Sequence, residues 1–470
     1  MEKRTFSPLL GSLALTMTIL SSCGTTSKIE ITIGMWPESQ STRDLAMFSV
    51  WKDRFEADYP EYTIKGAPYT YSVETVHAKG QSNKLPTVFQ TWFTEPKMLI
   101  SNAYIRDITP QLQTLGWYDK MDSDMRAALT SDGKVYGVPR DGYGLGLFLN
   151  LDTLNFYGIL RDVDSDGSID LYDENGDPMY PTTFQELYED CQIINEMSDS
   201  QTKGLLILSA NKNGGWQYSN MAWNFGAELQ KVNPDTGKWV GNLDDPKAVE
   251  ALQWIQTLAQ EDLLLNNVSL SYSDWYTRVT DQVAMAFVGS DVLSLAVTNG
   301  GMDRNNIAFV PMPSGPYGDQ YSLFGGTPFV FASNATDEQT MGALRFLEYM
   351  GRSPEVSDVA ISALREGNQV AVEKDMPILP TIKAWSDPAY LAEVTSLEAE
   401  YVNVDLKYYE DFFNSINTTR HSEEPYYAQE MYTLLDGCIQ SILADPDMAS
   451  ASTQLTTANA YFNNQYMSKL

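Results

Sequence analysis

The stretch KIEITIGMWP, residues 28–37, begins the segment that decides the fold class. Its isoleucines alternate with polar residues, which is typical of a strand with one covered face. LAMFSVWKDRFEADYP (45–60) then places apolar residues at helical spacing and ends at a proline, and YTIKGAPY (62–69) returns to the pattern of a strand. A strand, a helix and a second strand in this order predict a parallel crossover unit, and therefore an α/β fold.

Strand and helix patterns continue to alternate along the chain. LPTVFQTW (85–92) predicts a buried strand, and DGKVYGVPRDGYGLGLFLNLDTL (132–154) predicts a turn and two strands separated by a proline break. FGGTPFVFASNATDEQTMGALRFLEYM (324–350) predicts a strand, a turn and a helix, and the tail that follows residue 422 has a mostly helical pattern. Because 470 residues exceed the usual size of one domain, we expect two domains, joined by several crossings of the chain.

The N-terminus carries the features of an export signal. Two basic residues precede the apolar run LLGSLALTMTIL (9–20), which is too short to span a bilayer. LSSC (20–23) follows and resembles a bacterial lipobox, in which Cys23 becomes the lipidated first residue. We expect residues 1–22 to be a lipoprotein signal peptide, and the mature chain to be exported and held at the bacterial membrane by its lipid alone. The alternative is an ordinary secretion signal with an incidental cysteine.

Composition argues against several classes of function. The net charge of −31 repels phosphate, which argues against a nucleic-acid partner and against docking on anionic lipid. The only histidines are His77 and His421, without an HExxH motif or a Cys/His cluster, so we expect no zinc site; neither GxSxG nor a P-loop occurs. Cys191 and Cys438 could pair after export, but we expect two separate buried thiols, because a chain of this size needs no disulfide.

Five segments carry a resemblance to a known family. They are DGKVYGVPRDGYGLGLFLN (132–150), PTTFQELYE (181–189), DDPKAVEALQWIQ (244–256), VAMAFVGSDV (283–292) and VPMPSGPYG (310–318). Their order resembles that in family 1 extracellular solute-binding proteins, the maltose-binding-protein-like carbohydrate receptors of ABC importers. The resemblance implies a two-lobe periplasmic-binding-protein-like fold of type II, whose lobes are joined by hinge crossings and close on a ligand.

The same resemblance implies how the chain divides between the lobes. One lobe would hold residues 28–139 and 316–350, and the other would hold residues 140–315 and 351–470. The closed, liganded form would then dock on the transmembrane permease subunits.

The sequence departs from the family after the strand predicted near 283–289. Many sugar-binding relatives carry an aromatic residue where this chain has Asp291, so the usual stacking surface is missing at that position. An acid there accepts hydrogen bonds from sugar hydroxyls, or favours a ligand with an amine.

Sugar binding needs flat aromatic surfaces and a few fixed polar groups, placed where strands end in α/β proteins. The residues in such positions are Trp36, Glu38, Trp92, Glu95, Arg140, Asp141, Tyr143, Trp216, Trp223, Trp275, Asp291 and Phe324. Two of the tryptophans fall in NGGWQYSNMAWNFG (213–226), whose glycines and asparagines indicate a loop. Any single tryptophan could instead belong to the core, and the adjacent Arg140 and Asp141 could simply pair. Trp51, Trp239 and Trp254 fall within helical or hairpin patterns, which assigns them to the core or the surface.

DVDSDGSIDLYD, residues 162–173, has the spacing of an EF-hand-type calcium loop, with glycine at position 6. The ligand positions hold Asp162, Asp164, Asp166, Ser168 through its carbonyl, Asp170 through water, and Asp173. Carboxylates this close repel one another without a cation. We expect a structural calcium ion that fixes a surface loop of the second lobe and takes no part in chemistry. The alternative is a solvated acidic loop with Asx turns.

Together these features predict a lipid-anchored receptor that binds a carbohydrate, specifically an oligosaccharide, between its lobes and delivers it to an ABC permease. We expect a monomer without catalytic activity or an organic cofactor. Two alternatives stay open: a lipid-anchored, calcium-stabilised glycosidase, and a sugar-sensing subunit of a signalling system.

Overall fold

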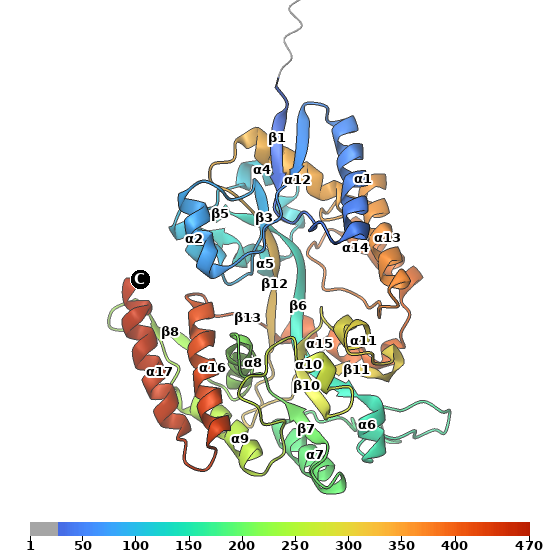
Figure 1. The fold of residues 1–470 in the computed structure, drawn as a ribbon, viewed down its shortest axis with the longest axis vertical. Coiled ribbons are helices and arrows are strands. Elements are labelled where there is room, and N and C mark those ends of the chain that lie inside the picture. The colour runs from blue at the N-terminus through green and yellow to red at the C-terminus, as the bar shows by residue number, and fades with distance from the viewer. Residues whose placement is uncertain (1–26) are drawn as a thin grey trace, which may run out of the picture.

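Two long strands, β6 (Gly137–Asn150) and β12 (Ser322–Phe331), run through both lobes of the molecule (Figure 1). The computed structural model describes residues 27–470. β6 contributes Val138 to the core of lobe 1, the upper lobe in Figure 1, and Leu145 to the core of lobe 2 below it. Both lobes are α/β, as predicted, and they share one nine-stranded sheet in which these antiparallel strands are neighbours.

Lobe 1 begins with the predicted crossover unit. Strand β1 (Ile29–Ile33) leads through helix α1 (Thr42–Asp58) to β2 (Tyr62–Gly66), which pairs with β1 in parallel. Strand β3 (Val88–Gln90) then joins β1 to β12. The smaller elements of this lobe are α2 (Val73–Gln81), α3 (Pro96–Ser101), α4 (Thr109–Leu115), α5 (Ser123–Ala128), α12 (Asp337–Tyr349), β4 (Thr130–Ser131) and β5 (Lys134–Val135).

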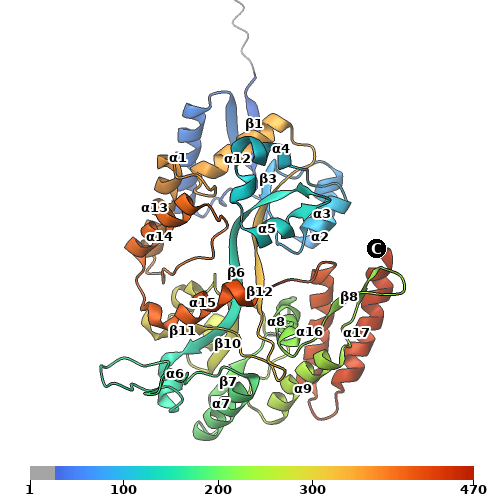
Figure 2. The same ribbon diagram turned by 180° about the vertical axis from the view of Figure 1, so that it is seen from behind.

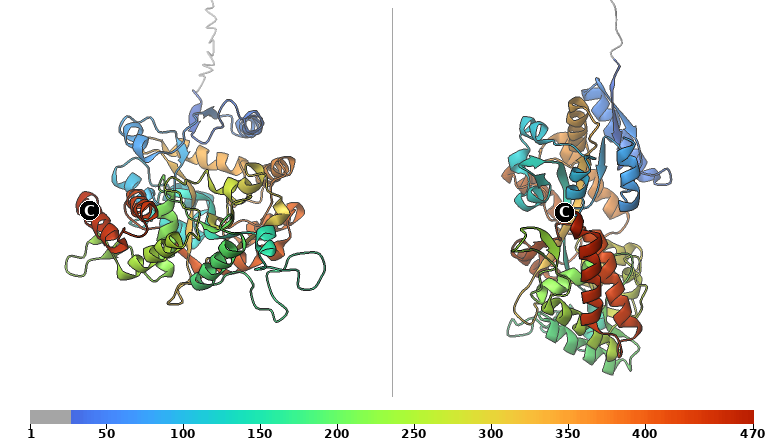
Figure 3. Two further views of the ribbon diagram at one scale, coloured as in Figure 1. Left: turned by 60° about the horizontal axis from the view of Figure 1, so that its bottom comes forward. Right: turned by 90° about the vertical axis from the view of Figure 1, so that its left-hand side faces the viewer.

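Lobe 2 is built on the far half of β6. Strand β10 (Val283–Gly289) pairs with β6 and with β7 (Lys203–Leu206), and β11 (Ile307–Val310) pairs with β6 as well. Its helices are α6 (Leu151–Phe156), α7 (Phe184–Met197), α8 (Asn213–Asn224), α9 (Pro246–Gln260), α10 (Trp275–Arg278), α11 (Ser294–Thr298), α15 (Glu410–Thr419), α16 (Ala428–Ala444) and α17 (Ala451–Gln465). Strands β8 (Gln230–Val232) and β9 (Trp239–Gly241) form a hairpin, and β13 (Arg420–Ser422) pairs with β12. Helices α16 and α17 lie on the side of lobe 2 that is at the left in Figure 1 and that faces the viewer in the right-hand view of Figure 3.

Helices α13 (Asp358–Glu373) and α14 (Pro388–Tyr401) do not lie in lobe 2, where residues 351–470 were expected. Tyr390 and Val394 of α14 pack in the core of lobe 1, and Figure 2 shows both helices beside α1. The chain returns to lobe 2 only between α14 and α15. The expectation was wrong for this segment because the apolar faces of the two helices are buried against lobe 1.

Pro139 does not break β6, although the sequence predicted two strands separated there. It lies opposite Pro328 of β12, next to a register shift between Gly326 and Pro328. The irregular pairing accommodates two prolines because neither can donate a ladder hydrogen bond.

Cys191 and Cys438 are buried free thiols, as expected. Across residues 27–470, no helix has the length and apolar character to cross a membrane. The predicted signal peptide and Cys23 lie outside the described residues.

Candidate functional site

A cavity of about 820 Å³ lies between the two lobes. Lobe 1 lines it with Phe93 and Met125, and lobe 2 lines it with Trp223, Trp239 and Tyr321. Of the predicted ligand-binding residues, Trp223 and Phe324 border this cavity, although they are only 2% and 5% exposed. A volume of this size accommodates a small organic ligand such as an oligosaccharide.

The lobe 2 wall of the cavity joins aromatic rings to acidic groups. The His421 ring lies over Trp223, with ring centroids 4.0 Å apart, and the Trp223 indole donates a hydrogen bond to Glu424 at 3.1 Å. Burial raises the pKa of Glu424 to about 7 and lowers that of His421. Arg420 lies over the Phe324 ring and pairs with Asp124 of lobe 1 at 2.6 Å, which links the wall to the opposite lobe.

A second group of side chains lies on the other face of the crossing strands. The space above two glycines shows on which face each aromatic side chain lies. A methyl group added to Gly142 of β6 would meet the Phe324 ring of β12. A methyl group added to Gly325 of β12 would lie 2.5 Å from the Tyr143 hydroxyl of β6. Because side chains alternate across a strand, Tyr143 and Phe324 point in opposite directions. Tyr143 therefore faces away from the surface that Phe324 gives to the cavity.

Tyr143 belongs to a group of three aromatic rings and one acid. The Trp216 ring is edge-on to Tyr143 and to Tyr272, with centroids 6.1 and 5.9 Å away. A methyl group on Gly289 would lie 2.6 Å from Asp291 Oδ1, 3.4 Å from Tyr143 Cδ2 and 3.5 Å from the Tyr272 hydroxyl. We call Tyr143, Trp216, Tyr272 and Asp291 the cage cluster. The structure thus brings together three predicted residues and adds Tyr272.

Acidic side chains with raised pKa values surround both groups. Loss of hydration, with help from the nearby Asp141 carboxylate, raises the pKa of Asp291 to about 6, although its side chain still contacts solvent. Burial raises the pKa of Glu423 to about 7, and Tyr432 donates a hydrogen bond to this carboxylate at 2.9 Å. Burial also raises the pKa of Glu95, against the opposing effect of its hydrogen bond from Tyr71.

Contacts between side chains join the lobes around this region. Lys212, just before α8, lies 3.4 Å from Glu74 of α2. The Gln429 amide donates to the Thr94 hydroxyl at 3.3 Å, and the Lys97 ammonium lies 4.7 Å from the centre of the Tyr426 ring. The two lobes are therefore in direct contact through these side chains.

The other predicted residues fall into three situations. Trp92 is 39% exposed and packs edge-on against Tyr71, so its ring offers a free face. Arg140 and Asp141 pair with each other at 2.6 Å. Trp36 packs on Phe48 and over Gly66 in lobe 1, and Glu38 beside it is exposed.

Trp275 is fully buried against Phe148, so its assignment to the ligand surface was wrong. Segment 213–226 is mostly helix α8, not a loop. Its glycines allow close packing, since a methyl group on Gly215 would lie 2.2 Å from the Tyr432 carbonyl.

Sequence reasoning missed Tyr272, Trp239 and Glu423. Tyr272 stands three residues before Trp275, so the correct segment was singled out but the wrong aromatic was chosen. Trp239 was assigned to the core or surface because it lies in a hairpin, yet it lines the cavity. Glu423 had no signal of its own among the many acidic residues of the chain.

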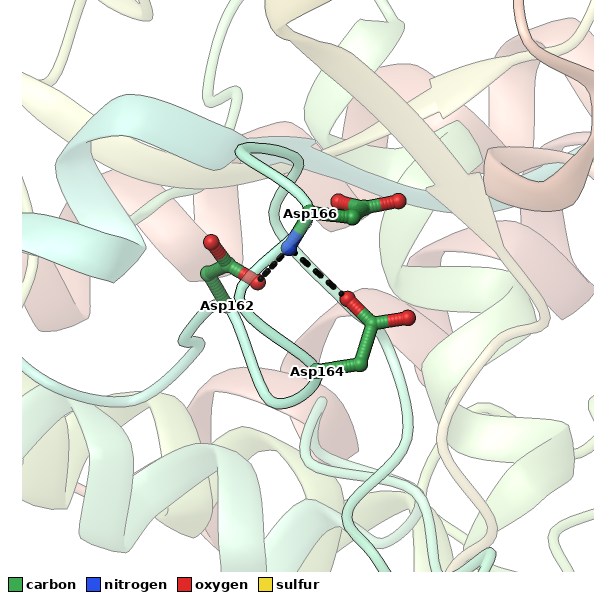
Figure 4. Close-up of side chains that lie close together, drawn as sticks. All are labelled: Asp162, Asp164 and Asp166. Atoms are coloured by element: carbon green, nitrogen blue, oxygen red, sulfur yellow. Dashed lines mark hydrogen bonds between the residues drawn. The ribbon is translucent and has the colours of Figure 1, made fainter.

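The loop 162–173 brings three of its predicted ligands together (Figure 4). Carboxylate oxygens of Asp162, Asp164 and Asp166 all lie within 4.8 Å of one another. Backbone N–H groups of the loop donate to all three: Asp166 N to Asp162 at 3.2 Å and to Asp164 at 3.1 Å, and Ser168 N to Asp166 at 2.7 Å. The Ser168 N–H contact lowers the pKa of Asp166.

The remaining carboxylates of this loop are engaged elsewhere. Asp170 accepts a hydrogen bond from the Val163 N–H at 2.9 Å and lies 3.6 Å from the Lys407 ammonium. Asp173 accepts hydrogen bonds from the backbone N–H groups of Asn175 and Asp177 in the following turn. Three carboxylates thus form the compact part of the loop.

Comparison with known proteins connects this geometry to a family. YcjN, the provisionally assigned ABC transporter periplasmic-binding protein of Escherichia coli (strain K12), is 22% identical over 380 residues, which cover 78% of this chain and 79% of that protein. The maltose-bound MalE3 of T. maritima has a TM-score of 0.62 at 15% identity, covering 92% of this chain and 98% of that one. UgpB of Mycobacterium tuberculosis, in complex with glycerophosphocholine, has a TM-score of 0.65 at 13% identity, covering 92% and 96%.

The two structures share the fold of this chain, which is therefore the two-lobe periplasmic-binding-protein fold. The family described as bacterial extracellular solute-binding protein matches residues 51–389, well over half of the sequence. The chain belongs to the family of bacterial extracellular solute-binding proteins.

Proposed function

We propose that this protein is the lipid-anchored receptor of an ABC importer, that its ligand is a carbohydrate of oligosaccharide size, and that it binds without catalysis. The observation that carries the proposal is the cavity of about 820 Å³ between the lobes, walled by aromatic rings and carboxylates. Aromatic faces match the C–H faces of sugars, and carboxylates accept hydrogen bonds from hydroxyl groups. Maltose in the related MalE3 structure supports the same class of ligand.

The two-lobe architecture supports a receptor that closes on its ligand. A ligand shifts the equilibrium between the open and the closed form only if its affinity for the closed form is higher. A ligand that contacts both lobes meets this condition, because it makes all of its contacts only in the closed form. Phe93 of lobe 1 and Tyr321 of lobe 2 face the same cavity, so one ligand can contact both. The liganded form would then present both lobes to the permease, and the chain would act as a monomer.

Export and lipid anchoring at Cys23 rest on the N-terminal sequence. Metabolic labelling with a radioactive or alkyne fatty acid tests them: wild-type protein should incorporate label and fractionate with membranes, whereas Cys23→Ser should not. Export without label in the wild-type protein would support the ordinary secretion signal instead.

The test of ligand class is thermal unfolding of residues 24–470 against a panel of mono- and oligosaccharides. A ligand at a hundredfold excess over Kd stabilises the folded state by about 2.7 kcal/mol. Stabilisation by one sugar family, without release of products during long incubation, supports a receptor. Cleavage of the sugar would support the glycosidase alternative, and stabilisation by no sugar would overturn the carbohydrate assignment.

We also propose that the loop 162–173 binds one structural calcium ion. The support is the EF-hand spacing of the sequence together with the approach of Asp162, Asp164 and Asp166. The Ile169 carbonyl accepts a hydrogen bond from Tyr408 at 2.7 Å, so the loop is attached to lobe 2 at this point. An ion there would hold the turn and would act on the ligand site only through stability.

A further inference from the structure

The cage cluster combines three aromatic walls with one carboxylate. The ring planes of Tyr143 and Trp216 meet at 64°, and those of Trp216 and Tyr272 meet at 77°. Rings at such angles form adjacent walls of a corner instead of a flat platform. Asp291 Oδ1 lies at this corner. A methyl group added to Gly289 would be within 3.5 Å of Asp291, Tyr143 and Tyr272, so these three side chains surround one point.

The cluster is open to a ligand. Tyr143, Trp216 and Tyr272 are each only partly buried, and the side chain of Asp291 is exposed. Lobe 2 covers Trp275 completely, whereas it leaves the three rings of the cage cluster partly uncovered.

Asp291 has no cationic partner in the described part of the chain. No lysine or arginine of residues 27–470 lies within 4.0 Å of its carboxylate. Arg140 is nearby, but it is paired with Asp141 at 2.6 Å. Burial raises the pKa of the Tyr143 hydroxyl, and the nearby carboxylates of Glu423 and Asp291 raise it further.

We propose that the cage cluster binds the ammonium group of a small ligand, with Asp291 as its counter-ion. The rings attract a cation through their negative faces, and the carboxylate supplies the charge. The cage cluster lies on the other face of the crossing strands from the cavity, and none of its residues lines that cavity, so the inference goes beyond the proposed function: it is a separate site for a small compound with an amine or a quaternary ammonium. A neutral sugar would use the carboxylate as a hydrogen-bond acceptor and would gain nothing from the angular arrangement of the rings.

Two pairs of small probes test the charge directly. Choline is compared with 3,3-dimethyl-1-butanol, its neutral analogue of the same shape, and glucosamine is compared with glucose. Ligand-observed NMR titrations of the wild-type protein give the Kd of each probe. We expect at least one cation to bind ten times or more tightly than its neutral counterpart.

Asp291→Asn should reduce that preference below threefold, while Asp235→Asn, at an exposed acid outside the cluster, should leave it unchanged. Far-UV circular dichroism and the melting temperature of each variant establish that it is folded. Tyr272→Leu, which removes one wall and keeps the charge, should weaken cation binding several-fold.

No preference in either pair, or a preference that Asp291→Asn retains, would overturn the inference. The sugar panel separates this failure from failure of the proposed function. Stabilisation by a neutral oligosaccharide without any cation preference would leave the sugar receptor and reject the cage cluster as a cation site. Stabilisation by no sugar, with cation preference intact, would leave the cage and reject the carbohydrate.

Discussion

Lys212 and Glu74 belong to different lobes and face each other at 3.4 Å. Asp436 accepts a hydrogen bond from the Lys212 N–H, which fixes the backbone from which this side chain extends. On the other side, the Ser72 hydroxyl donates to Glu74 at 2.6 Å and is the main reason why the pKa of Glu74 falls to about 2. The acid is therefore fully charged at neutral pH, and the pair joins the lobes in the arrangement seen here.

The first prediction concerns this ion pair. Because Glu74 is largely exposed, the pair should contribute less than about 1 kcal/mol to closure. Lys212→Met should therefore weaken ligand binding by up to about fivefold, with little change in melting temperature. Isothermal titration with the ligand identified from the sugar panel measures the effect.

Lys238→Met supplies the control, since Lys238 has no ion-pair partner in the part of the chain that the structure describes. Raising sodium chloride from 50 to 500 mM should bring the wild-type affinity close to that of Lys212→Met. An affinity loss that persists unchanged at high salt would mean that Lys212 contacts the ligand instead of Glu74.

The second prediction concerns Glu423, whose pKa burial raises from 4.5 to about 7. Between these two values the folded state holds a proton that the unfolded state has released, so the stability falls as the pH rises from 4.5 to 7. Glu423→Gln keeps an acceptor for the Tyr432 hydroxyl and removes the free-energy cost of ionising a buried carboxyl group. It should stabilise the protein by about 1 kcal/mol at pH 8 and by much less at pH 5.

Melting temperatures of wild type and Glu423→Gln at pH 5 and pH 8 check this sign. Asp235→Asn, at an exposed loop position, should show no pH-dependent difference from wild type. Equal destabilisation by Glu423→Gln at both pH values would show that Glu423 is charged and well solvated in the folded state.

The sequence predicted the elements of the fold better than their assignment to lobes. Alternating isoleucines and helical spacing identified β1, α1 and β2, because periodicity reports which face of an element is buried. It does not report what covers that face. Helices α13 and α14 are amphipathic in either lobe, and only the packing of Tyr390 against lobe 1 distinguishes the two arrangements.

The sequence predicted which strand ends carry the candidate site, but it did not predict which side chains at those ends come together. Asp291, Tyr143 and Trp216 were singled out and do converge. Trp275 and Tyr272 lie in the same short segment, yet one is buried and the other is open to the site. Composition cannot separate them because a tryptophan serves a core as well as a ligand surface.

The third prediction contrasts two tryptophans. Trp92 is 39% exposed, so Trp92→Ala should cost less than about 1 kcal/mol in stability and should weaken sugar binding about tenfold if its free face stacks on the ligand. Trp275 is fully buried, so Trp275→Ala should cost roughly 3–5 kcal/mol. Urea unfolding and calorimetric titration measure the two effects. Unchanged affinity in Trp92→Ala would remove Trp92 from the ligand surface.

The fourth prediction concerns calcium. Removal of divalent ions with EDTA should lower the melting temperature by several degrees, and millimolar calcium should restore it, because an ion bound only by the folded state stabilises it. Asp162→Asn and Asp164→Asn should each abolish the calcium effect, whereas Asp235→Asn should retain it. Asp173→Asn should also retain most of it, since Asp173 accepts backbone hydrogen bonds in the next turn. Equal melting temperatures with EDTA and with calcium would leave the loop as a solvated acidic turn.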